Sequence, residues 1–537
     1  MQAKTFLALW AAIAFVLLKI VTLVTTRKRH ATLSRELGCK PAPIAEPGDV
    51  LGISAIRQLM KASNEYRLPD FIVERMKNVS EREGRHVTTI RHVVLGEQNV
   101  FTCEPKNVQT VLATKFKDFE LGERRVGNFH PLLGDGIFAS NGKKWEHSRA
   151  LLRPQFARGQ ISDLDLEERH VQNMMKVLPV DGADGWTKTI NIQALFFRLT
   201  VDSATEFLFG ESIDSQLAAL PGYAATKSLP AECDERIFAY AFDKAQWHLS
   251  RAVRLGKRYW LGHTPDFKKQ CRSVHAFVDY FVQLALSKGL ALDHQQKSTT
   301  DTDKKKEGYV FLDALAAQTR DPIELRNQLL NILLAGRDTT ASLLSWLFLL
   351  LAKHPDIYAK LRRSVVEDFG TYAAPEEITY TGLKNCSYLQ HTIAEVLRLF
   401  PVVPMNSRRS VVDTCLPLGG GADGQSPVFI PQGTEVEYSV FAMHRRKDLW
   451  GDDADSFKPE RWQGRKVGWE YLPFNGGPRI CIGQQFALTE ASYVVVRLLQ
   501  RFDMVEGVGV VEPFKHGLTL TDCPAQGVNV TLREAKE

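Results

Sequence analysis

The stretch that decides the fold is FNGGPRICIG, residues 474–483, in which Cys481 stands between a glycine pair and Gly483. Glycines permit tight turns and let the backbone come close to a flat ligand. Backbone N–H groups in such a loop can point at the sulfur and tune its charge. The following QQFAL segment favours a helix, and negative charge is stabilised near a helix N-terminus. The pattern therefore predicts that Cys481 is a thiolate ligand of a metal.

Two side chains in this stretch support that interpretation. Phe474 is expected to pack over the thiolate and exclude water, and Arg479 supplies a cation that can pair with a carboxylate of the ligand. The alternative is a glycine turn around an ordinary buried cysteine, which is how we interpret each of the other seven cysteines. Because none of the eight forms a CxxC pair, the chain resembles a protein with reduced thiols and not a disulfide scaffold.

A second unusual segment is AGRDTT, residues 335–340, within the apolar run from Leu329 to Leu351. A glycine inside a helix costs about 1 kcal/mol relative to alanine, and a threonine hydroxyl can bond back to a carbonyl and bend the helix. We expect a local kink that opens space beside a flat ligand, with Asp338 and Thr339 as a proton relay. Simple helix packing is the alternative.

Charged pairs at helical spacing suggest a scaffold for the cysteine loop. Glu395 and Arg398 lie three residues apart on one helix face, and Arg461 supplies a second arginine. Buried charges need several partners, so we interpret this set as structural. His444 either joins the set or is an ordinary half-buried histidine. Trp145 and Arg149 are four residues apart and therefore point in one direction.

These motifs together resemble the cytochrome P-450 family. The matching patterns are F-x-x-G-x-R-x-C-x-G, (A/G)-G-x-(D/E)-T-(T/S), E-x-x-R, P-E-R and W-x-x-x-R. The AGRDTT segment precedes the cysteine loop, which is the order expected for that family. The resemblance implies a mainly α fold with small β-sheets and a haem b (iron protoporphyrin IX) whose iron is bound by Cys481. It also implies a monooxygenase that uses O2 and receives electrons from NADPH through an NADPH–cytochrome reductase.

The resemblance also assigns roles to individual residues. Thr339 is the proton-delivering alcohol and Asp338 its acidic partner, while Glu395, Arg398 and Arg461 lock the fold behind the haem. The cofactor-binding set, with Arg408 less secure because Arg409 is adjacent, is Trp145, Arg149, Arg408, Phe474, Arg479, Cys481 and Gly483.

The N-terminus reads as a membrane anchor. Residues from Phe6 to Val24 are almost all apolar, and a basic cluster at 27–30 follows, which places the downstream chain on the cytosolic side. A cleaved signal peptide is the rival interpretation, but its charge normally comes first. We predict an anchor at 1–30, a proline-containing linker at 31–45 and a haem-binding domain at 46–537. The expected location is the endoplasmic reticulum membrane, in contact with membrane lipid.

Composition agrees with a folded enzyme. The 537-residue chain is 44% hydrophobic with a formal net charge of +6, which does not indicate a nucleic-acid partner.

The polar residues 295–308 are expected to form a surface loop. We expect helices at 145–156, 324–352 and 388–400, and strands at 86–94, 428–430, 435–440 and 528–532. Basic residues that we expect to attract an acidic reductase are Arg445, Arg446, Lys447, Lys458, Arg465 and Lys466.

Several stretches, including GDGIF at 134–138 and GQQFALTE at 483–490, resemble the fungal alkane- and fatty-acid-hydroxylating branch; Asn141 departs from the acidic residue expected there. An apolar substrate suits the residues expected near the distal pocket, although some of them can be plain core: Leu330, Leu333, Leu334, Val402, Val403, Met405, Leu518 and Leu520. Oxidation of a polyketide, terpenoid or lipid intermediate in fungal secondary metabolism is the alternative. Two other functions fit fewer of these features. An isomerase or a peroxygenase would not need the Asp338–Thr339 relay, and a non-enzymatic haem carrier or sensor would not need an apolar pocket.

Overall fold

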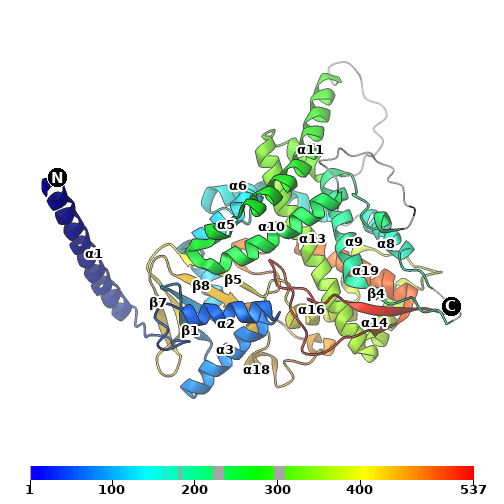
Figure 1. Ribbon diagram of the computed structural model, residues 1–537. Coiled ribbons are helices and arrows are strands. Elements are labelled where there is room, and N and C mark those ends of the chain that lie inside the picture. Colours follow the sequence, from blue (N-terminus) through cyan, green and yellow to red (C-terminus); the bar gives the residue numbers. More distant parts are fainter. Residues whose placement is uncertain are drawn as a thin grey trace. The chain divides into compact units, whose positions relative to one another are not determined.

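The computed structural model describes residues 2–161, 164–180, 184–220, 222, 235–295 and 309–536. The polar stretch predicted as a loop lies outside these residues, apart from Gln295, which ends a helix. The fold is mainly helical with small sheets, as predicted (Figure 1). The helices are α1 Gln2–Glu36, α2 Ile53–Asn64, α3 Leu68–Glu83, α4 Pro105–Gln109, α5 Glu123–Leu133, α6 Gly142–Leu152, α7 Arg158–Ile161, α8 Asp165–Lys176, α9 Ile192–Phe209, α10 Glu235–Ala252, α11 Pro265–Gln295, α12 Phe311–Ala316, α13 Pro322–Lys353, α14 Pro355–Phe369, α15 Tyr380–Asn385, α16 Ser387–Leu399, α17 Val440–Met443, α18 Lys447–Trp450 and α19 Gln484–Arg501.

The strands form small sheets. One has the order β1-β2-β8-β5-β3, a second β4-β10-β9, and a third pairs β6 with β7. The predicted strands correspond to β1, β7, β8 and β10, whereas the remaining strands are short or polar and carry little apolar alternation. Their bounds are β1 Thr89–Val94, β2 Glu97–Thr102, β3 Phe119–Glu120, β4 Ile190–Asn191, β5 Met405–Ser410, β6 Thr414–Gly420, β7 Ser426–Ile430, β8 Glu435–Ser439, β9 Phe502–Gly507 and β10 Asn529–Glu534.

The chain divides into two compact units. One contains residues 1–55, 73–120 and 407–438, and the other contains residues 56–72, 121–406 and 439–537. Each unit therefore gathers segments that are distant in sequence. The predicted domain boundaries, with one haem-binding domain over 46–537, remain a prediction.

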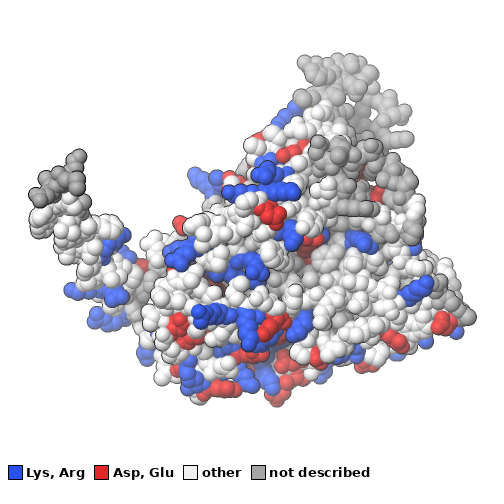
Figure 2. Space-filling view, in the orientation of Figure 1, with Lys and Arg blue, Asp and Glu red and all other residues white. Residues whose placement is uncertain are grey.

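Helix α1 is long and apolar enough to cross a membrane, with a mean hydropathy of 2.5 in its most apolar window. It continues to Glu36, beyond the predicted end of the anchor at residue 30. Basic side chains gather at its C-terminal end while its apolar part is uncharged apart from Lys19 (Figure 2). Arg29 there binds Asp413 at 2.8 Å, which fixes the end of the helix to the turn before β6 within the same unit.

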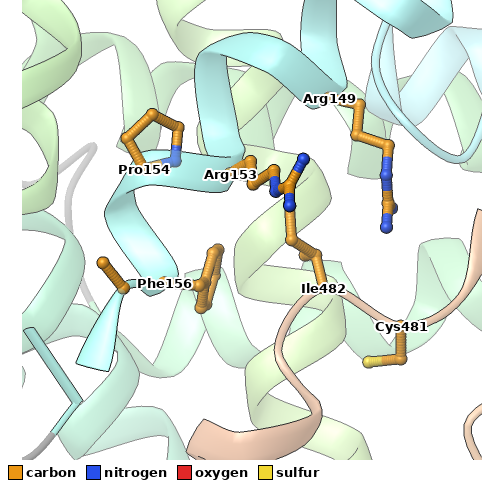
Figure 3. A pocket seen from close by; sticks show the side chains of 7 residues that line it. Arg149, Arg153, Pro154, Phe156, Cys481 and Ile482 are labelled. Atoms are coloured by element: carbon orange, nitrogen blue, oxygen red, sulfur yellow. The ribbon is translucent and has the colours of Figure 1, made fainter.

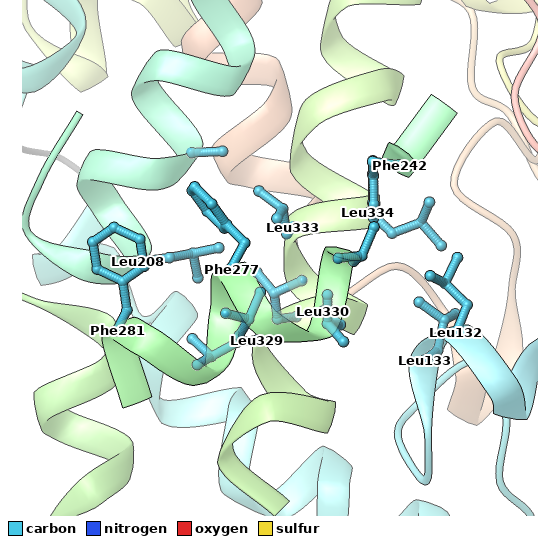
Figure 4. Close-up of a cluster of buried hydrophobic side chains, with 14 of the residues drawn as sticks. Leu132, Leu133, Leu208, Phe242, Phe277, Phe281, Leu329, Leu330, Leu333 and Leu334 are labelled. Atoms are coloured by element: carbon cyan, nitrogen blue, oxygen red, sulfur yellow. The ribbon is translucent and has the colours of Figure 1, made fainter. Parts of the chain in front are cut away.

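The second unit is built around α13, whose residues from Leu325 to Leu351 are nearly all buried. Asp321 caps the helix by accepting the Ile323 N–H, and Pro322 occupies the first turn, where its missing donor is harmless. Helices α9, α11 and α19 pack around it. Leucines of α13 interdigitate with phenylalanines of α10 and α11 in one apolar cluster, shown in Figure 4. This core fixes the helix that carries the AGRDTT segment.

Candidate active site

The loop that carries Cys481 has the tight geometry that its glycines predict. The Cys481 N–H donates to the Phe474 carbonyl at 3.0 Å and so closes the loop. Asn475 and Gly477 both have positive φ. A Cβ at Gly476 would lie 2.7 Å from the Trp469 ring, so no larger residue fits there without movement. Gly483 then precedes α19 directly.

The Cys481 thiol faces a pocket that opens to the surface. Among the described cysteines, Cys103, Cys271 and Cys386 are buried, whereas Cys481 is exposed. Its sulfur borders a cavity of about 500 Å³ that Arg149, Arg153 and Ile482 also line (Figure 3). Burial by the surrounding protein raises the pKa of Cys481, while the Gly483 backbone N–H and Arg149 lower it. The thiol is therefore accessible to a ligand and has groups that stabilise a thiolate.

Two guanidinium groups flank the cysteine loop. Arg149 extends from α6 toward the loop and donates to the Ile480 carbonyl at 3.1 Å (Figure 3). Arg479 stacks over the Trp145 ring, with its central carbon 4.4 Å from the ring centroid. Trp145 and Arg149 thus meet the loop from one helix, as their i, i+4 spacing predicts. An accessible thiol, a cavity and two cations fit a haem with two propionates.

The charged scaffold is fully buried and paired. Glu395 binds Arg398 through two contacts of 2.8 Å, and neither side chain has any exposed surface. Arg461 approaches the same carboxylate at 3.2 Å, and the Trp462 indole N–H donates to it at 2.9 Å. Arg398 also donates to the His444 carbonyl at 2.9 Å. Since every charge has several partners, this set has the geometry expected of a rigid structural element.

His444 joins this scaffold and is not an ordinary half-buried histidine. Its Nδ1 lies 3.1 Å from the Arg398 carbonyl, and its Nε2 accepts the Leu472 N–H at 3.0 Å. These bonds require a neutral ring with the proton on Nδ1. Burial, followed by the charge of Arg398, lowers the pKa of His444 to about 3. A neutral histidine therefore connects the E-x-x-R helix to the segment that leads into the cysteine loop.

The predicted relay residues share the middle of α13 but point to different neighbours. The Thr339 hydroxyl donates to the Ala335 carbonyl at 2.7 Å. Asp338 lies 3.2 Å from Arg337, which also binds Asp243 of α10. Burial raises the pKa of Asp338, and Arg337 opposes that shift. The hydrogen-bonded helix is continuous through this segment, so the expected kink does not interrupt α13.

One face of α13 in this segment is less buried than the rest. Ala335, Gly336 and Thr339 are half-buried, whereas the preceding residues 327–334 are all buried. By contrast, Leu330 and Leu333 are fully buried in the apolar cluster, so these two are core residues in the structure and not lining of an open pocket. Leu334 and Val402 are also buried, and the half-buried members of the predicted pocket set are Val403, Met405, Leu518 and Leu520.

The structure places Arg408 and the residues of the predicted basic patch in different surroundings. Arg408 lies buried on β5, in the other compact unit, where it donates to the Ser407 carbonyl, so its propionate role stays a prediction. Arg445 and Arg446 are not surface charges, because Arg445 stacks 3.6 Å over Phe441 and Arg446 has 9% of its side chain exposed. Arg465 is half-buried over Trp450. The exposed members of the predicted basic patch are Lys447, Lys458 and Lys466.

Sequence reasoning missed the contacts by which two asparagines hold the site together. Asn331 of α13 accepts the Phe138 N–H at 3.0 Å and so binds the 134–138 loop to this helix. Asn141 accepts from Arg479 at 3.2 Å and pairs with both backbone groups of Leu121. An aspartate at 141 would lack the amide N–H that Leu121 accepts. Asn327 and Asn331 pack closely against two glycines of the GDGIF stretch, a contact that no spacing in the sequence indicates.

Comparison with known proteins agrees with this geometry. A family model described as cytochrome P450 matches residues 66–526. Cytochrome P450 monooxygenase g430 of Fusarium sp is 51% identical over 97% of this chain and 89% of its own length. Cytochrome P450 monooxygenase alt2 of Alternaria solani is 42% identical over 98% and 97%, and cytochrome P450 52A13 of Debaryomyces hansenii is 45% identical over 92% of each. The chain therefore belongs to the cytochrome P450 family, the haem-thiolate monooxygenases that receive electrons from NAD(P)H through a reductase.

Proposed function

We propose that the protein is a membrane-anchored monooxygenase that hydroxylates a long aliphatic chain, such as an alkane or a fatty acid, with Cys481 as the ligand of the haem iron. The observation that carries the proposal is the accessible Cys481 sulfur beside a cavity that Arg149 also lines. A thiolate ligand supplies the electron density that favours O–O bond cleavage when the haem is bound.

The residues assigned to the site have separate tasks in this proposal. Arg149 and Arg479 bind the acidic groups of the cofactor, and Trp145 orients Arg479 through its ring face. Phe474 closes the loop through its carbonyl and excludes water with its ring. Thr339 holds a proton at its hydroxyl for delivery into the site. Asp338 is its buried acid partner, which must turn from Arg337 to take part.

Apolar side chains favour an aliphatic substrate. Val403, Met405, Leu518 and Leu520 are half-buried in the segments expected to meet the substrate. Each methylene that they bury contributes about 0.8 kcal/mol. The resemblance to the alkane- and fatty-acid-hydroxylating branch agrees with this choice, and several relatives carry names of the 52A group.

One observation favours a second candidate. The chain is 51% identical to the g430 monooxygenase and 45% identical to cytochrome P450 52A13, so its similarity is not confined to the 52A group. The alternative substrate is a polyketide, terpenoid or lipid intermediate in fungal secondary metabolism. Such a substrate uses the same thiolate, relay and apolar lining.

The anchor suggests where the reaction occurs. With α1 in the endoplasmic reticulum membrane and its basic end on the cytosolic side, apolar substrates reach the enzyme from membrane lipid. The NADPH–cytochrome reductase then approaches from the same side. Lys447, Lys458 and Lys466 are the exposed cations available to an acidic partner from the predicted set.

Turnover in microsomes that contain the protein and a reductase tests the proposal. Labelled alkanes and fatty acids of several lengths are supplied with NADPH, and the products are separated by chromatography. We expect oxidation at or near the chain terminus. Full thiolate-type absorption with no turnover of any chain would contradict the aliphatic substrate and favour the pathway intermediate.

A further inference from the structure

A tight loop precedes the last strand of the chain. In residues 516–523 the Gly517 N–H donates to the Cys523 carbonyl at 2.7 Å, and the Thr519 N–H donates to the Thr521 carbonyl at 3.0 Å. The tip carries two half-buried leucines, Leu518 and Leu520. The backbone bonds close the loop at its base and leave its tip as the part that meets other elements.

This loop contacts α13 and the segment that contains Val403, which the proposed function assigns to the substrate. Leu520 packs against the apolar cluster that contains Leu334 of α13. The Asp522 N–H donates to the Val402 carbonyl at 2.9 Å, next to Val403. A change in the position of the loop therefore changes the apolar lining on this side of the site.

A buried ion pair holds the base of the loop. His516 Nδ1 lies 2.8 Å from Asp522 Oδ2, with 3% of His516 and none of Asp522 exposed. Asp70 of α3 approaches the other ring nitrogen at 3.4 Å. The Trp346 indole N–H donates to the Asp522 carbonyl at 3.0 Å. The histidine thus connects both ends of the loop to α3, while Asp522 connects them to α13.

Charged and aromatic side chains from the neighbouring elements surround the His516 ring. Trp346, Phe400 and Phe441 pack around its ring, and Arg445 lies near both Asp70 and Asp522. Burial alone would lower the pKa of His516, but Asp522 and Asp70 raise it to about 9. Burial raises the pKa of Asp522, and His516 opposes that shift. The histidine therefore carries its proton at neutral pH.

We propose that His516 and Asp522 are positioning residues that hold the 517–521 loop against the substrate and so set which carbon is oxidised. This inference rests on the proposed function. A buried ion pair adds little net stability compared with apolar side chains of similar volume, whereas removal of one partner leaves the other as an unpaired buried charge. Because both partners sit at the base of the loop, loss of the pair moves the leucines at its tip.

The test uses the full-length enzyme with its reductase and three variants of the pair. His516→Phe keeps a ring but removes both bonds, Asp522→Asn keeps the shape but removes the charge, and His516→Asn retains an N–H near the position of Nδ1. The matched control is His170→Phe on α8, because His170 is equally buried and lies 2.7 Å from Glu206 of α9. Labelled dodecanoic acid and hexadecane are the substrates.

We expect His516→Phe and Asp522→Asn to spread oxidation over several carbons and to raise KM by about tenfold, the effect of losing one buried bonded partner. The kcat and the thiolate-type spectrum change less, His516→Asn restores most of the selectivity, and His170→Phe keeps the wild-type products. In the wild type, the product distribution broadens as the pH rises through about 9, and in His516→Phe it does not depend on pH. An unchanged distribution in His516→Phe, or the same spread in His170→Phe, would overturn the proposal.

Hydrogen exchange separates this inference from the proposed function. If the wild type oxidises neither substrate, the proposal of an aliphatic substrate fails. The amides of the 517–521 loop still report whether the His516–Asp522 pair holds the loop. We expect His516→Phe to speed their exchange by about tenfold and His170→Phe to leave it unchanged. Equal exchange rates in the wild type and in His516→Phe would overturn the positioning role of the His516–Asp522 pair, whatever the substrate is.

Discussion

The scaffold behind the cysteine loop and the middle of α13 satisfy their polar groups to very different degrees. Glu395 accepts from Arg398, Arg461, Trp462 and the backbone of Lys458, and both ring nitrogens of His444 are bonded. On α13, by contrast, the Asp338 Oδ1 lies near Arg337 without a hydrogen bond, and Thr339 bonds only to its own helix in the described part of the chain. Rigidity is concentrated behind the cysteine loop, and spare bonding capacity is concentrated at the proposed proton relay.

Removal of one partner from the scaffold should have the largest effect. We expect Arg398→Ala to leave Glu395 as a buried unpaired charge, which costs about 3–5 kcal/mol. The variant should express as protein without bound haem, as measured by the ratio of Soret to protein absorbance. The control is Glu512→Ala, which removes an exposed partner of Lys353 and should change stability by less than about 1 kcal/mol. Normal haem content in Arg398→Ala would show that the scaffold is dispensable.

Loss of the Thr339 hydroxyl should come next. Thr339→Ala should keep the spectrum, because the scaffold is untouched. It should lower the rate of product formation by about 100-fold, the lower end of what a positioned proton donor contributes, and raise peroxide release per NADPH. Thr339→Ser retains the hydroxyl and should restore most of the coupling. Unchanged coupling in Thr339→Ala would remove Thr339 from the relay and leave the spare capacity of α13 unexplained.

The stability that His444 gives the scaffold should be lost at acidic pH. Since the folded-state pKa of about 3 lies below the usual value near 6.5, its stabilising effect is complete above pH 6.5 and is lost as the pH falls toward 3. The slope is at most about 1.4 kcal/mol per pH unit. His444→Gln should be less stable than wild type at pH 7, and the difference should shrink at low pH, as followed by denaturant midpoints. A difference that does not depend on pH would contradict a neutral buried histidine.

The smallest effect on stability should be that of Gly336→Ala. A Cβ there meets only the Ala204 Cβ, at 3.8 Å, and alanine favours a helix by about 1 kcal/mol. We expect a slightly higher melting temperature together with slower turnover, because the added methyl fills space on the half-buried face. Higher stability with full turnover would show that this space is not used.

The sequence predicted residues whose chemistry is local and missed those whose role depends on tertiary packing. The glycines around Cys481, the Glu395–Arg398 pair and the Trp145–Arg149 spacing are recognisable because each role follows from neighbours in sequence. Arg445 was predicted as a surface charge, although it stacks over Phe441, four residues before it, and over Phe400, which is distant in sequence. Leu330 and Leu333 could not be assigned to pocket or core from periodicity, since both face apolar surroundings.

Contacts between residues that are distant in sequence, or that carry no motif, account for the rest of what the sequence did not predict. His516 and Asp522 are six residues apart and carry no motif, and Asp70 reaches them from more than four hundred residues away in sequence. The same holds for Asn331 and the loop at 134–138. Neither set has a spacing that indicates contact, so both required the fold.

The most direct test of the central claim is the carbon monoxide difference spectrum of the reduced protein. We predict a thiolate-type Soret band in the wild type, its loss in Cys481→Ser, and its retention in Cys39→Ser, which changes a cysteine in the other compact unit. A wild-type spectrum without that band, or a Cys481→Ser protein that keeps it, would contradict the assignment of Cys481 as the iron ligand.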